Sequence, residues 1–300
     1  SKKSGEYAFF ASYNGEMSPA ITVTVTSGMQ GLPEDPQPDK FDGFKQRVLA
    51  VQGTSLGCVY CPLMIAGLTE YAKLEESKST VLVSAHAIMS GDDMISDYST
   101  AVAKGMGFNT TGIPALLFNM RSSSEILGLS TADSPSSVAK RVQSAAQTLL
   151  QGGANTGICA AVSGTEASGS IKVTAAVKVG KAGKYRICAW VLEDDIHATG
   201  QLNNYPSLEG TYDFTHHSNV LRCISSTSPI TGVNLGGKEE CKSGETLGFS
   251  YEFDLKKLSV TNMANVRVAI IVTRNESGAR YMVDNVISSK LNSQVKFEYK

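Results

Sequence analysis

One stretch of the sequence decides the fold: Val48-Leu49-Ala50-Val51-Gln52-Gly53-Thr54-Ser55-Leu56-Gly57-Cys58-Val59-Tyr60-Cys61-Pro62. An apolar run long enough for a buried strand leads through a turn of small residues into a Cys-x-x-Cys motif. Apolar residues then recur at spacings of three and four, which predicts one face of a helix. These residues are Leu63, Met64, Gly67, Leu68, Tyr71, Ala72 and Leu74. The stretch therefore predicts a strand, a turn that carries two cysteines, and a helix.

The position of Cys58 suits redox chemistry. We expect it at the N-terminus of the helix, where free N–H groups and the helix dipole stabilise a thiolate. Such a place lowers the pKa of a thiol from about 8.5 into the range of roughly 3.5–7.5, which makes it a nucleophile for disulfide exchange. Cys61 falls one turn later, within bonding reach. Pro62 suits the first turn, where its missing N–H would have no partner.

Length and composition set limits on the function. The 300 residues suggest two domains and a fragment of a third, and an apolar content of 42% lets each bury a core. The formal net charge of -1, without a cluster of Lys or Arg, argues against a nucleic-acid partner. No apolar run reaches about 18 residues, so we predict no membrane-spanning helix. No phosphate-binding loop, Ser-His-Asp order or carboxylate pair occurs, and we predict no cofactor.

The cysteine content indicates the compartment. There are six cysteines, four of them outside the Cys-x-x-Cys, and such usage is typical of an oxidising environment. The first residues lead directly into strand-like sequence without a secretory leader. We therefore expect a mature chain from which a leader has been removed.

Residues 1–27 are expected to form a β-hairpin. Tyr7–Ala11 and Ile21–Val25 are rich in aromatic and β-branched residues, and Asn14-Gly15 between them is a hairpin-turn signal. The stretch resembles the last two strands of a bacterial immunoglobulin-like domain, so we predict a partial domain of this kind. Because a lone hairpin is marginal in water, we predict that it docks on another domain or a neighbouring molecule.

Two domains are predicted after an acidic, proline-containing linker at residues 28–43. Residues 44–151 alternate strand and helix patterns, which is typical of an α/β domain. Residues 152–300 show strand signals, about seven in number, and predict an all-β sandwich domain. Within it, residues 180–183 read Gly-Lys-Ala-Gly and predict a hairpin turn between two strands.

A second motif supports the redox interpretation. Pro114 opens an apolar strand soon after a glycine, which resembles the cis-proline that flanks the dithiol in thioredoxin-like folds. Cis bonds are only about 5–6% of X-Pro bonds, so the resemblance alone carries this expectation. The backbone of Ile113 would pair with a partner's strand. Val59-Tyr60, between the cysteines, resembles oxidant or isomerase motifs, and Tyr60 is a further candidate binding residue.

Two departures from thioredoxin favour an alternative. Gln52 stands six residues before the first cysteine, where thioredoxins have a buried acid, and Gly57 replaces their tryptophan. The pair Cys58–Cys61 is, in this alternative, a fixed structural disulfide on a domain without a redox role. A zinc site is a third interpretation, but no second pair of ligands follows at finger spacing, and we predict no metal.

One histidine, His86, is a candidate binding residue, and an adjacent pair of histidines is not. His86 ends a predicted strand; it either lies near the dithiol and biases its ionisation or hydrogen-bonds a loop. His216 and His217 are adjacent, so on a strand they point to opposite faces and do not share a simple metal site.

The remaining cysteines are expected to pair within the second domain. Cys159, Cys188, Cys223 and Cys241 allow three connectivities. We favour the disulfides Cys159–Cys188 and Cys223–Cys241, each of which closes a loop. Bridges of this kind stabilise a fold by roughly 2–4 kcal/mol.

Residues 44–300 resemble the outer membrane protein 28-related family of Bacteroidetes lipoproteins. The resemblance rests on Thr54–Pro62, on Ser84-Ala85-His86, on Gly112-Ile113-Pro114, and on a signature of Glu193, Gln201, Tyr212 and residues 217–222. It implies a thioredoxin-like domain followed by a β-sandwich, a periplasmic or outer-membrane address in the cell envelope, and a lipid anchor outside this sequence. It assigns no chemistry to Glu193, Gln201, His217 and Arg222, which we expect to form a buried polar cluster.

Two functional hypotheses follow. In the first, the protein is a cell-envelope thiol–disulfide exchange protein: Cys58 attacks a protein disulfide, Cys61 resolves the mixed disulfide, and Pro114 helps to hold the partner. In the second, it is a non-catalytic surface lipoprotein whose β-sandwich binds protein or glycan. An exposed Cys58 in an apolar groove favours the first, and a pair buried under the second domain favours the second. The partner, the direction of electron flow and the oligomeric state do not follow from the sequence.

Overall fold

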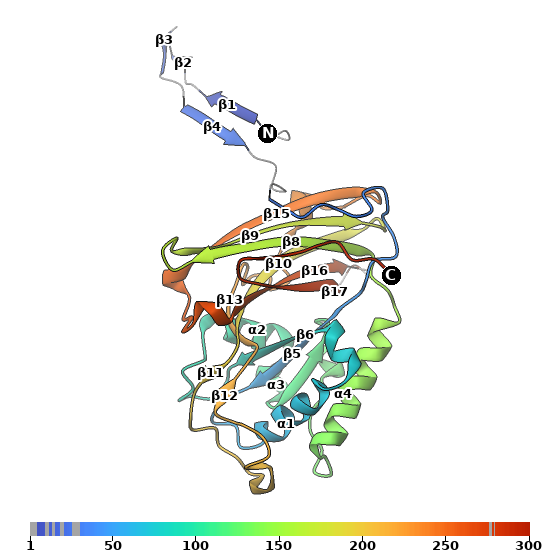
Figure 1. Ribbon diagram of the computed structural model, residues 1–300, viewed down its shortest axis with the longest axis vertical. Coiled ribbons are helices and arrows are strands. Elements are labelled where there is room, and N and C mark those ends of the chain that lie inside the picture. The colour runs from blue at the N-terminus through green and yellow to red at the C-terminus, as the bar shows by residue number, and fades with distance from the viewer. Residues whose placement is uncertain are drawn as a thin grey trace.

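The structure, a computed structural model, describes residues 5–9, 12–13, 16–18, 21–25, 31–275, 278 and 280–300. It is a mixed α/β fold built around one large β-sheet (Figure 1). The strands of this central sheet lie in the order β17-β16-β10-β13-β6-β5-β7, and β14 also pairs with β10. A second, four-stranded sheet has the order β15-β9-β8-β18.

The bounds of the elements are as follows. The central sheet contains β5 (Val48–Thr54), β6 (Thr80–His86), β7 (Ala115–Phe118), β10 (Lys184–Glu193), β13 (Val220–Ile224), β14 (Val233–Asn234), β16 (Val266–Asn275) and β17 (Tyr281–Lys290). The second sheet contains β8 (Thr156–Thr165), β9 (Ser170–Val179), β15 (Glu245–Asp254) and β18 (Ser293–Val295). The helices are α1 (Cys61–Tyr71), α2 (Asp97–Met106), α3 (Phe108–Thr111) and α4 (Pro135–Leu150). Short 3-10 turns are η1 (Glu75–Ser79), η2 (Ser123–Glu125), η3 (Pro206–Leu208), η4 (Leu235–Gly237), η5 (Leu255–Lys257) and η6 (Met263–Asn265).

The central sheet joins the two halves of the chain. β6 and β13 run parallel and meet at Ser84 and Val220, and the Ser84 N–H donates to the Asn219 carbonyl at 2.7 Å. β5 lies parallel to β6, and β7 lies antiparallel to β5. The domain boundary at 151/152 stays a prediction, but the chain segments on either side of it share one sheet.

Both faces of the central sheet are covered by other elements. Helices α2 and α3 pack on one face, over a core that includes Val51, Phe108 and Trp190. On the other face, α1 and α4 cover β5 and β7, whereas the four-stranded sheet covers β10 and β16 (Figure 1). α1 approaches α4 closely because residue 67 is glycine: a Cβ there would lie 2.3 Å from a methyl carbon of Val138.

Local signals predicted α4 well but not the connection after β9. Ser134 caps α4 by accepting a hydrogen bond from the Ser137 N–H, and Pro135 opens the helix, as expected. The hairpin predicted at residues 180–183 is wrong. Both edges of β9 are already paired, with β8 and β15, so the chain leaves this sheet and continues as β10 of the central sheet.

The N-terminal strands pair as a hairpin. β1 (Gly5–Phe9) and β4 (Ile21–Val25) are antiparallel, and the short strands β2 (Ser12–Tyr13) and β3 (Glu16–Met17) pair between them. The predicted turn at residues 14–15 lies outside the described residues. That the hairpin belongs to a partial immunoglobulin-like domain and docks on another surface stays a prediction.

Lys178 fixes the described part of the predicted linker to the second sheet. Its side chain is only 1% exposed, and its Nζ donates to Asp35 Oδ2 at 2.7 Å. The same ammonium donates to the carbonyls of Gln37 and Pro38 at 2.8 and 2.9 Å and lies 4.4 Å from the centre of the Phe41 ring. The segment is therefore held against β9 by a buried cation with a full set of partners.

Replacing Lys178 by Met is expected to lower the free energy of unfolding by about 2 kcal/mol, because Asp35 and two carbonyls lose their common donor. The cost stays below that of a fully buried pair, since Asp35 is partly exposed and water replaces some of the contact. Urea denaturation measures it. The control is Lys172→Met on the same strand, whose side chain is 62% exposed and should change stability by less than about 0.5 kcal/mol. Equal losses in both variants would contradict the assignment.

Candidate functional site

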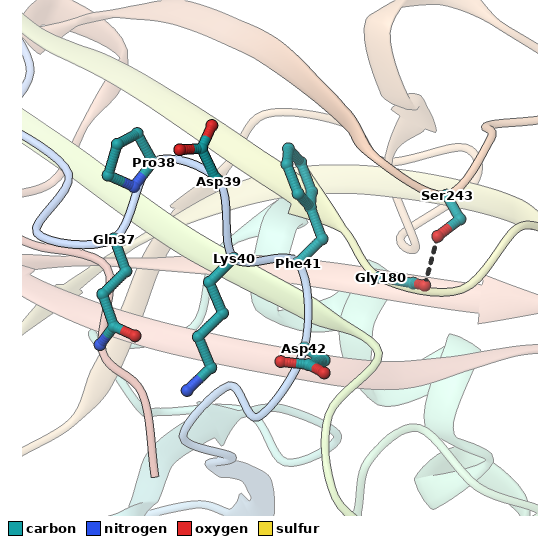
Figure 2. Close-up of a pocket in the computed structure, with 8 residues that line it drawn as sticks. All are labelled: Gln37, Pro38, Asp39, Lys40, Phe41, Asp42, Gly180 and Ser243. Atoms are coloured by element: carbon teal, nitrogen blue, oxygen red, sulfur yellow. Dashed lines mark hydrogen bonds between the residues drawn. The ribbon is translucent and has the colours of Figure 1, made fainter.

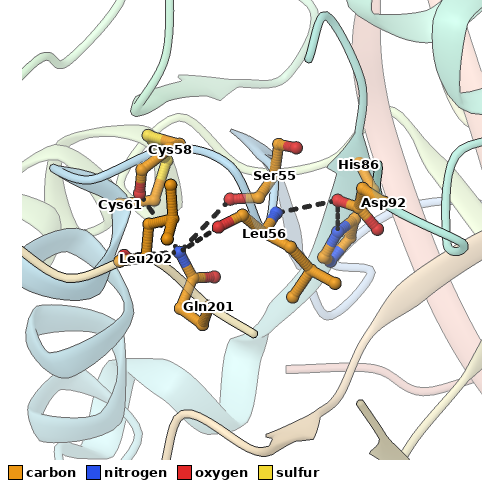
Figure 3. The surroundings of a disulfide bond; sticks show 8 residues. All are labelled: Ser55, Leu56, Cys58, Cys61, His86, Asp92, Gln201 and Leu202. Atoms are coloured by element: carbon orange, nitrogen blue, oxygen red, sulfur yellow. Dashed lines mark hydrogen bonds and ion pairs between the residues drawn. A yellow bond between two sulfur atoms is a disulfide. The ribbon is translucent and has the colours of Figure 1, made fainter. Parts of the chain in front are cut away.

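Cys58 and Cys61 form a disulfide bond where β5 passes into α1 (Figure 3). Their Cα atoms are 5.4 Å apart. α1 begins at Cys61, with Tyr60 as its N-cap, so the expectation that Cys58 itself opens the helix is wrong. The Cys58 N–H donates to the Ser55 carbonyl at 3.1 Å, and this hydrogen bond closes one turn. A second turn, from residue 58 to residue 61, follows it and leads into the helix. Cys58 thus lies directly before the helix N-terminus.

The disulfide is nearly covered, so the exposed Cys58 that would favour exchange is not found, although large apolar side chains near the disulfide are exposed. Only 4% of Cys58 and none of Cys61 is exposed. In contrast, Val59, Tyr60, Met89 and Leu202 are large exposed hydrophobic residues. Val59 and Tyr60 lie between the cysteines, Met89 lies 3.5 Å from where a Cβ on Gly57 would be, and Leu202 lies beside the disulfide in Figure 3. We call these four residues the apolar rim.

Gln201 holds the turn that carries the disulfide. Its side-chain Nε2 lies 3.3 Å from the carbonyl oxygen of Ser55 and 3.1 Å from those of Leu56 and Cys58 (Figure 3). One amide group therefore lies within hydrogen-bonding distance of three carbonyls of the turn. This contact with the cysteine turn was not predicted for Gln201, because its partners are 143 to 146 positions away.

Gln201 belongs to a longer segment that wraps this end of α1. We call residues 196–217 the clasp; its ends pair as β11 (Ile196–His197) and β12 (His216–His217). Its backbone follows the cysteine turn: the N–H of Leu202 donates to Leu56 at 2.8 Å, and that of Asn204 donates to Val59 at 2.9 Å. The second half of the chain thus supplies part of the wall around the disulfide.

Asp92 fixes the same turn from the other side. Its Oδ2 accepts hydrogen bonds from the Leu56 N–H at 2.9 Å and lies 2.8 Å from Nδ1 of His86, and its Oδ1 accepts one from the Met94 N–H at 3.0 Å. Burial raises the pKa of the Asp92 carboxyl, but the His86 ring and the two N–H donors outweigh this effect and lower the pKa to about 2. His86 therefore acts on the cysteine turn through Asp92.

The buried Asp92 carboxylate is expected to make stability depend on pH. Because its folded pKa is about 2 and its unfolded value is 3.8, its contribution is complete above about pH 4 and is lost as the pH falls toward 2. The loss should be about 2 kcal/mol. It is measured as the difference in unfolding free energy between the wild type and Asp92→Asn, which should shrink by this amount from pH 5 to pH 2. A constant difference would contradict the assignment.

Pro114 lies next to the end of β5. The Ile113–Pro114 peptide bond is cis, as expected from the resemblance. Ala115 pairs with Gly53, so Pro114 occupies the following position along the ladder, beside Thr54. Gly53 makes this approach sterically feasible, since a Cβ there would lie 3.0 Å from a methyl of Ile113. The start of β7 and the cysteine turn thus project from the same edge of the sheet.

The two disulfides predicted in the second half are wrong. Cys159, Cys188, Cys223 and Cys241 are all free and buried. Cys159 packs against Phe297 on the outer side of the second sheet, whereas Cys188 lies in the core under α2, so strand faces separate them. Cys223 and Cys241 share the core between the sheets, but their thiols lie near different carbonyls, those of Ile224 and Leu235. Burial raises the pKa of Cys188 to about 12 and that of Cys223 to about 11, which makes both thiols poor nucleophiles.

The polar residues of the C-terminal signature do not form one cluster. Glu193 and Arg222 make a buried ion pair with a distance of 2.9 Å between Arg222 Nε and Glu193 Oε2. Gln201 lies in the clasp, and His217 packs edge-on against His86 with 5.6 Å between ring centres. The expectation of a single cluster is therefore wrong, because the clasp carries Gln201 and His217 away from the ion pair.

A pocket of about 670 Å³ lies away from the disulfide. It lies between residues 37–42 and the strand ends at Gly180 and Ser243, where Ser243 Oγ donates to the Gly180 carbonyl at 2.7 Å (Figure 2). Within the ranges that the structure describes, no three His, Cys, Asp or Glu side chains are placed to share a metal ion. Across the same ranges, no helix has the length and hydropathy that a membrane crossing requires.

Comparisons with known proteins add a family and a fold. The family described as "Outer membrane protein Omp28" matches residues 103–295. The solved structure of HBP35 of Porphyromonas gingivalis superposes with a TM-score of 0.62 and 16% identity, over 83% of this chain and 76% of that chain. A domain of the outer membrane lipoprotein Omp28 from the same organism is 21% identical over 46% of this chain and 89% of its own, with a TM-score of 0.29. No curated protein matches. The likeness to HBP35 shows a shared fold.

Proposed function

We propose that this chain, which belongs to the Omp28 family of outer membrane proteins of the cell envelope, exchanges disulfides with protein partners through Cys58 and Cys61. One observation carries the proposal: the disulfide joins the first residue of α1 to the turn before it and is bordered by the apolar rim. Exposed apolar side chains gathered in one place mark a surface that binds a partner. A lipid anchor on a part of the protein outside this sequence would attach it to the membrane.

The strand arrangement supports a thioredoxin-like unit in residues 44–151. β5 leads into the dithiol turn, β6 is parallel to it, and β7 is antiparallel and follows a cis-proline. α1 and α4 lie on one face and α2 on the other. The two facing sheets of residues 152–300 support a β-sandwich that extends the same central sheet.

The exchange begins at Cys58, the less covered of the two cysteine residues. A thiolate of a reduced partner attacks Cys58 Sγ; the Cys58–Cys61 bond breaks, and Cys61 leaves as a thiolate. A second partner thiolate then attacks the mixed disulfide, which releases the Cys58 thiolate and leaves the partner with a disulfide. Two electrons pass from the partner to this protein. The adjoining helix N-terminus stabilises the thiolate on Cys58.

The apolar rim and the start of β7 form the proposed docking surface. The occupant is an extended segment of a protein that carries the reacting cysteines. Apolar side chains of this segment contact Tyr60 and Leu202, and its backbone pairs with that of Ile113 before Pro114. This surface would give the exchange its preference for polypeptides over small thiols.

The alternative is a structural disulfide on a surface lipoprotein whose second half binds protein or glycan. The near-complete burial of Cys58 and Cys61 and the cover that the clasp provides favour it.

The test uses a defined peptide substrate, a short apolar peptide whose cysteine is activated with thionitrobenzoate. Cys61→Ser should release thionitrobenzoate quickly and form a stable mixed disulfide with the peptide through Cys58. Cys58→Ser, which keeps the fully covered Cys61, is the matched control and should react much more slowly. The same slow reaction in both variants would contradict exchange and support the structural disulfide.

A further inference from the structure

A second pocket, of about 270 Å³, lies beside the clasp and is separate from the sulfur pair. One wall is α1, with Ile65, Leu68 and Ala72, so the pocket runs along the end of this helix that is remote from Cys61. The polar lining comes from β5, from β6, from the end of the clasp and from the two residues that follow it. It consists of Gln52, Thr54, Ser84, His86, Asp213, His216, His217, Ser218 and Asn219, and the remaining lining residues are Thr69 and Leu82.

Three buried side chains of this pocket have polar atoms without a partner among the described residues. The atoms are Nε2 of Gln52, Oγ1 of Thr54 and Nε2 of His217, and the residues are 3%, 2% and 6% exposed. Buried polar groups in proteins almost always have a partner, and one left unpaired costs roughly 1–3 kcal/mol. Three unpaired groups on one pocket indicate that a polar occupant completes them.

The free atoms define the hydrogen bonds that this occupant must make. Gln52 Oε1 accepts from Ser84 Oγ at 3.3 Å, so the free Nε2 of Gln52 is a donor. Burial, and then the nearby His86, lower the pKa of His217, which keeps the ring neutral. The backbone of Ala198 favours a proton on the ring, which places the single N–H at Nδ1 and leaves the free Nε2 as an acceptor. Thr54 accepts or donates. The occupant must therefore both donate and accept.

The charges around the pocket argue for an uncharged occupant. Two carboxylates near the pocket are already paired: Asp92 with His86 at 2.8 Å, and Asp213 with His216 at 2.7 Å. Among the described residues that line the pocket, none is Lys or Arg, so an anion would find no cation to pair with.

We propose that this pocket binds a small uncharged polyhydroxy compound, such as a monosaccharide or a cyclic polyol. A hydroxyl group both donates and accepts hydrogen bonds, as the free atoms of Gln52, Thr54 and His217 require. The C–H face of such a compound packs on Ile65 and Leu68. The volume corresponds to about nine water molecules at ~30 Å³ each, which suits a compound of this size. The proposal does not depend on the redox role of the cysteines.

The test is saturation-transfer NMR of the whole chain with D-glucose, D-galactose, D-mannose and myo-inositol, each titrated separately. At least one should bind saturably and shift the imidazole signals of His217. Gln52→Leu removes the donor and the unpaired amide together. It should weaken binding by about tenfold or more while the melting temperature without sugar stays equal or rises.

Two further variants keep the result interpretable. His217→Phe removes the acceptor and should also lose binding, whereas Lys172→Met, far away on β9, should bind as the wild type does. The proposal is overturned if none of the four compounds binds saturably, or if Gln52→Leu and His217→Phe both bind them unchanged. Binding of sodium acetate in place of every sugar would overturn it too.

Discussion

Replacing Arg222 by Met is expected to lower the free energy of unfolding by about 3–5 kcal/mol, the largest stability effect that we predict. Arg222 is 5% exposed and Glu193 is fully buried, so the variant leaves a buried carboxylate without its cation. The guanidinium also donates to the Ser259 carbonyl. Since β10 and β13 carry this pair next to the junction with β6, its loss should weaken the middle of the central sheet. Urea denaturation of the full chain measures the effect.

The matched control for Arg222 separates charge from packing. Glu193 Oε1 accepts hydrogen bonds from the N–H groups of Thr261 and Asn262 at 2.8 and 2.6 Å, and a glutamine oxygen can keep both. The double variant Glu193→Gln with Arg222→Met should therefore recover much of the lost stability, because no unpaired charge remains. A double variant as unstable as Arg222→Met alone would show that packing, and not the ion pair, matters here.

Replacing Gln201 by Leu is expected to raise the reduction potential of the Cys58–Cys61 pair by about 30 mV, the equivalent of 1.4 kcal/mol for a two-electron couple. In the oxidised protein, the Gln201 side chain contacts the carbonyls of the cysteine turn. Its loss should therefore destabilise the disulfide form more than the more relaxed dithiol form. Equilibration with dithiothreitol and quantification of free thiols measure the potential.

The control for Gln201 lies in the same clasp. The Asn203 side chain bonds to the backbone of Tyr205 and makes none of the contacts to the cysteine turn. Asn203→Ala should thus leave the potential unchanged, although it removes a hydrogen bond from the same segment. If both variants shift the potential equally, Gln201 has no special role and the clasp acts only as a cover.

The sequence was most informative where the signal is local. The Cys-x-x-Cys after an apolar run, Ser134 before Pro135, and the β-branched run Ser170–Val179 each carry their cause within a few residues, and the structure has a disulfide, a capped helix and a strand there. Hydrophobic period, capping and spacing are short-range properties, so one sequence suffices to detect them.

The features that the sequence did not predict depend on distant contacts. The junction of the central sheet rests on Ser84 and Val220, which are far apart in the chain and give no joint pattern. The clasp has little periodicity, and Gln201 acts on carbonyls, which every residue has. Cysteine spacing likewise carries no information on strand faces, so it could not reveal that Cys159 and Cys188 lie in different cores.

The most direct test of exchange at Cys58 and Cys61 is the reduction potential of this pair in the wild-type protein. Thiol–disulfide exchange proteins have potentials between about −120 and −270 mV, whereas structural disulfides of secreted proteins lie below about −300 mV. We predict that the pair equilibrates with glutathione and dithiothreitol buffers within the first range. A pair that stays oxidised until the buffer is well below −300 mV would contradict the proposed function.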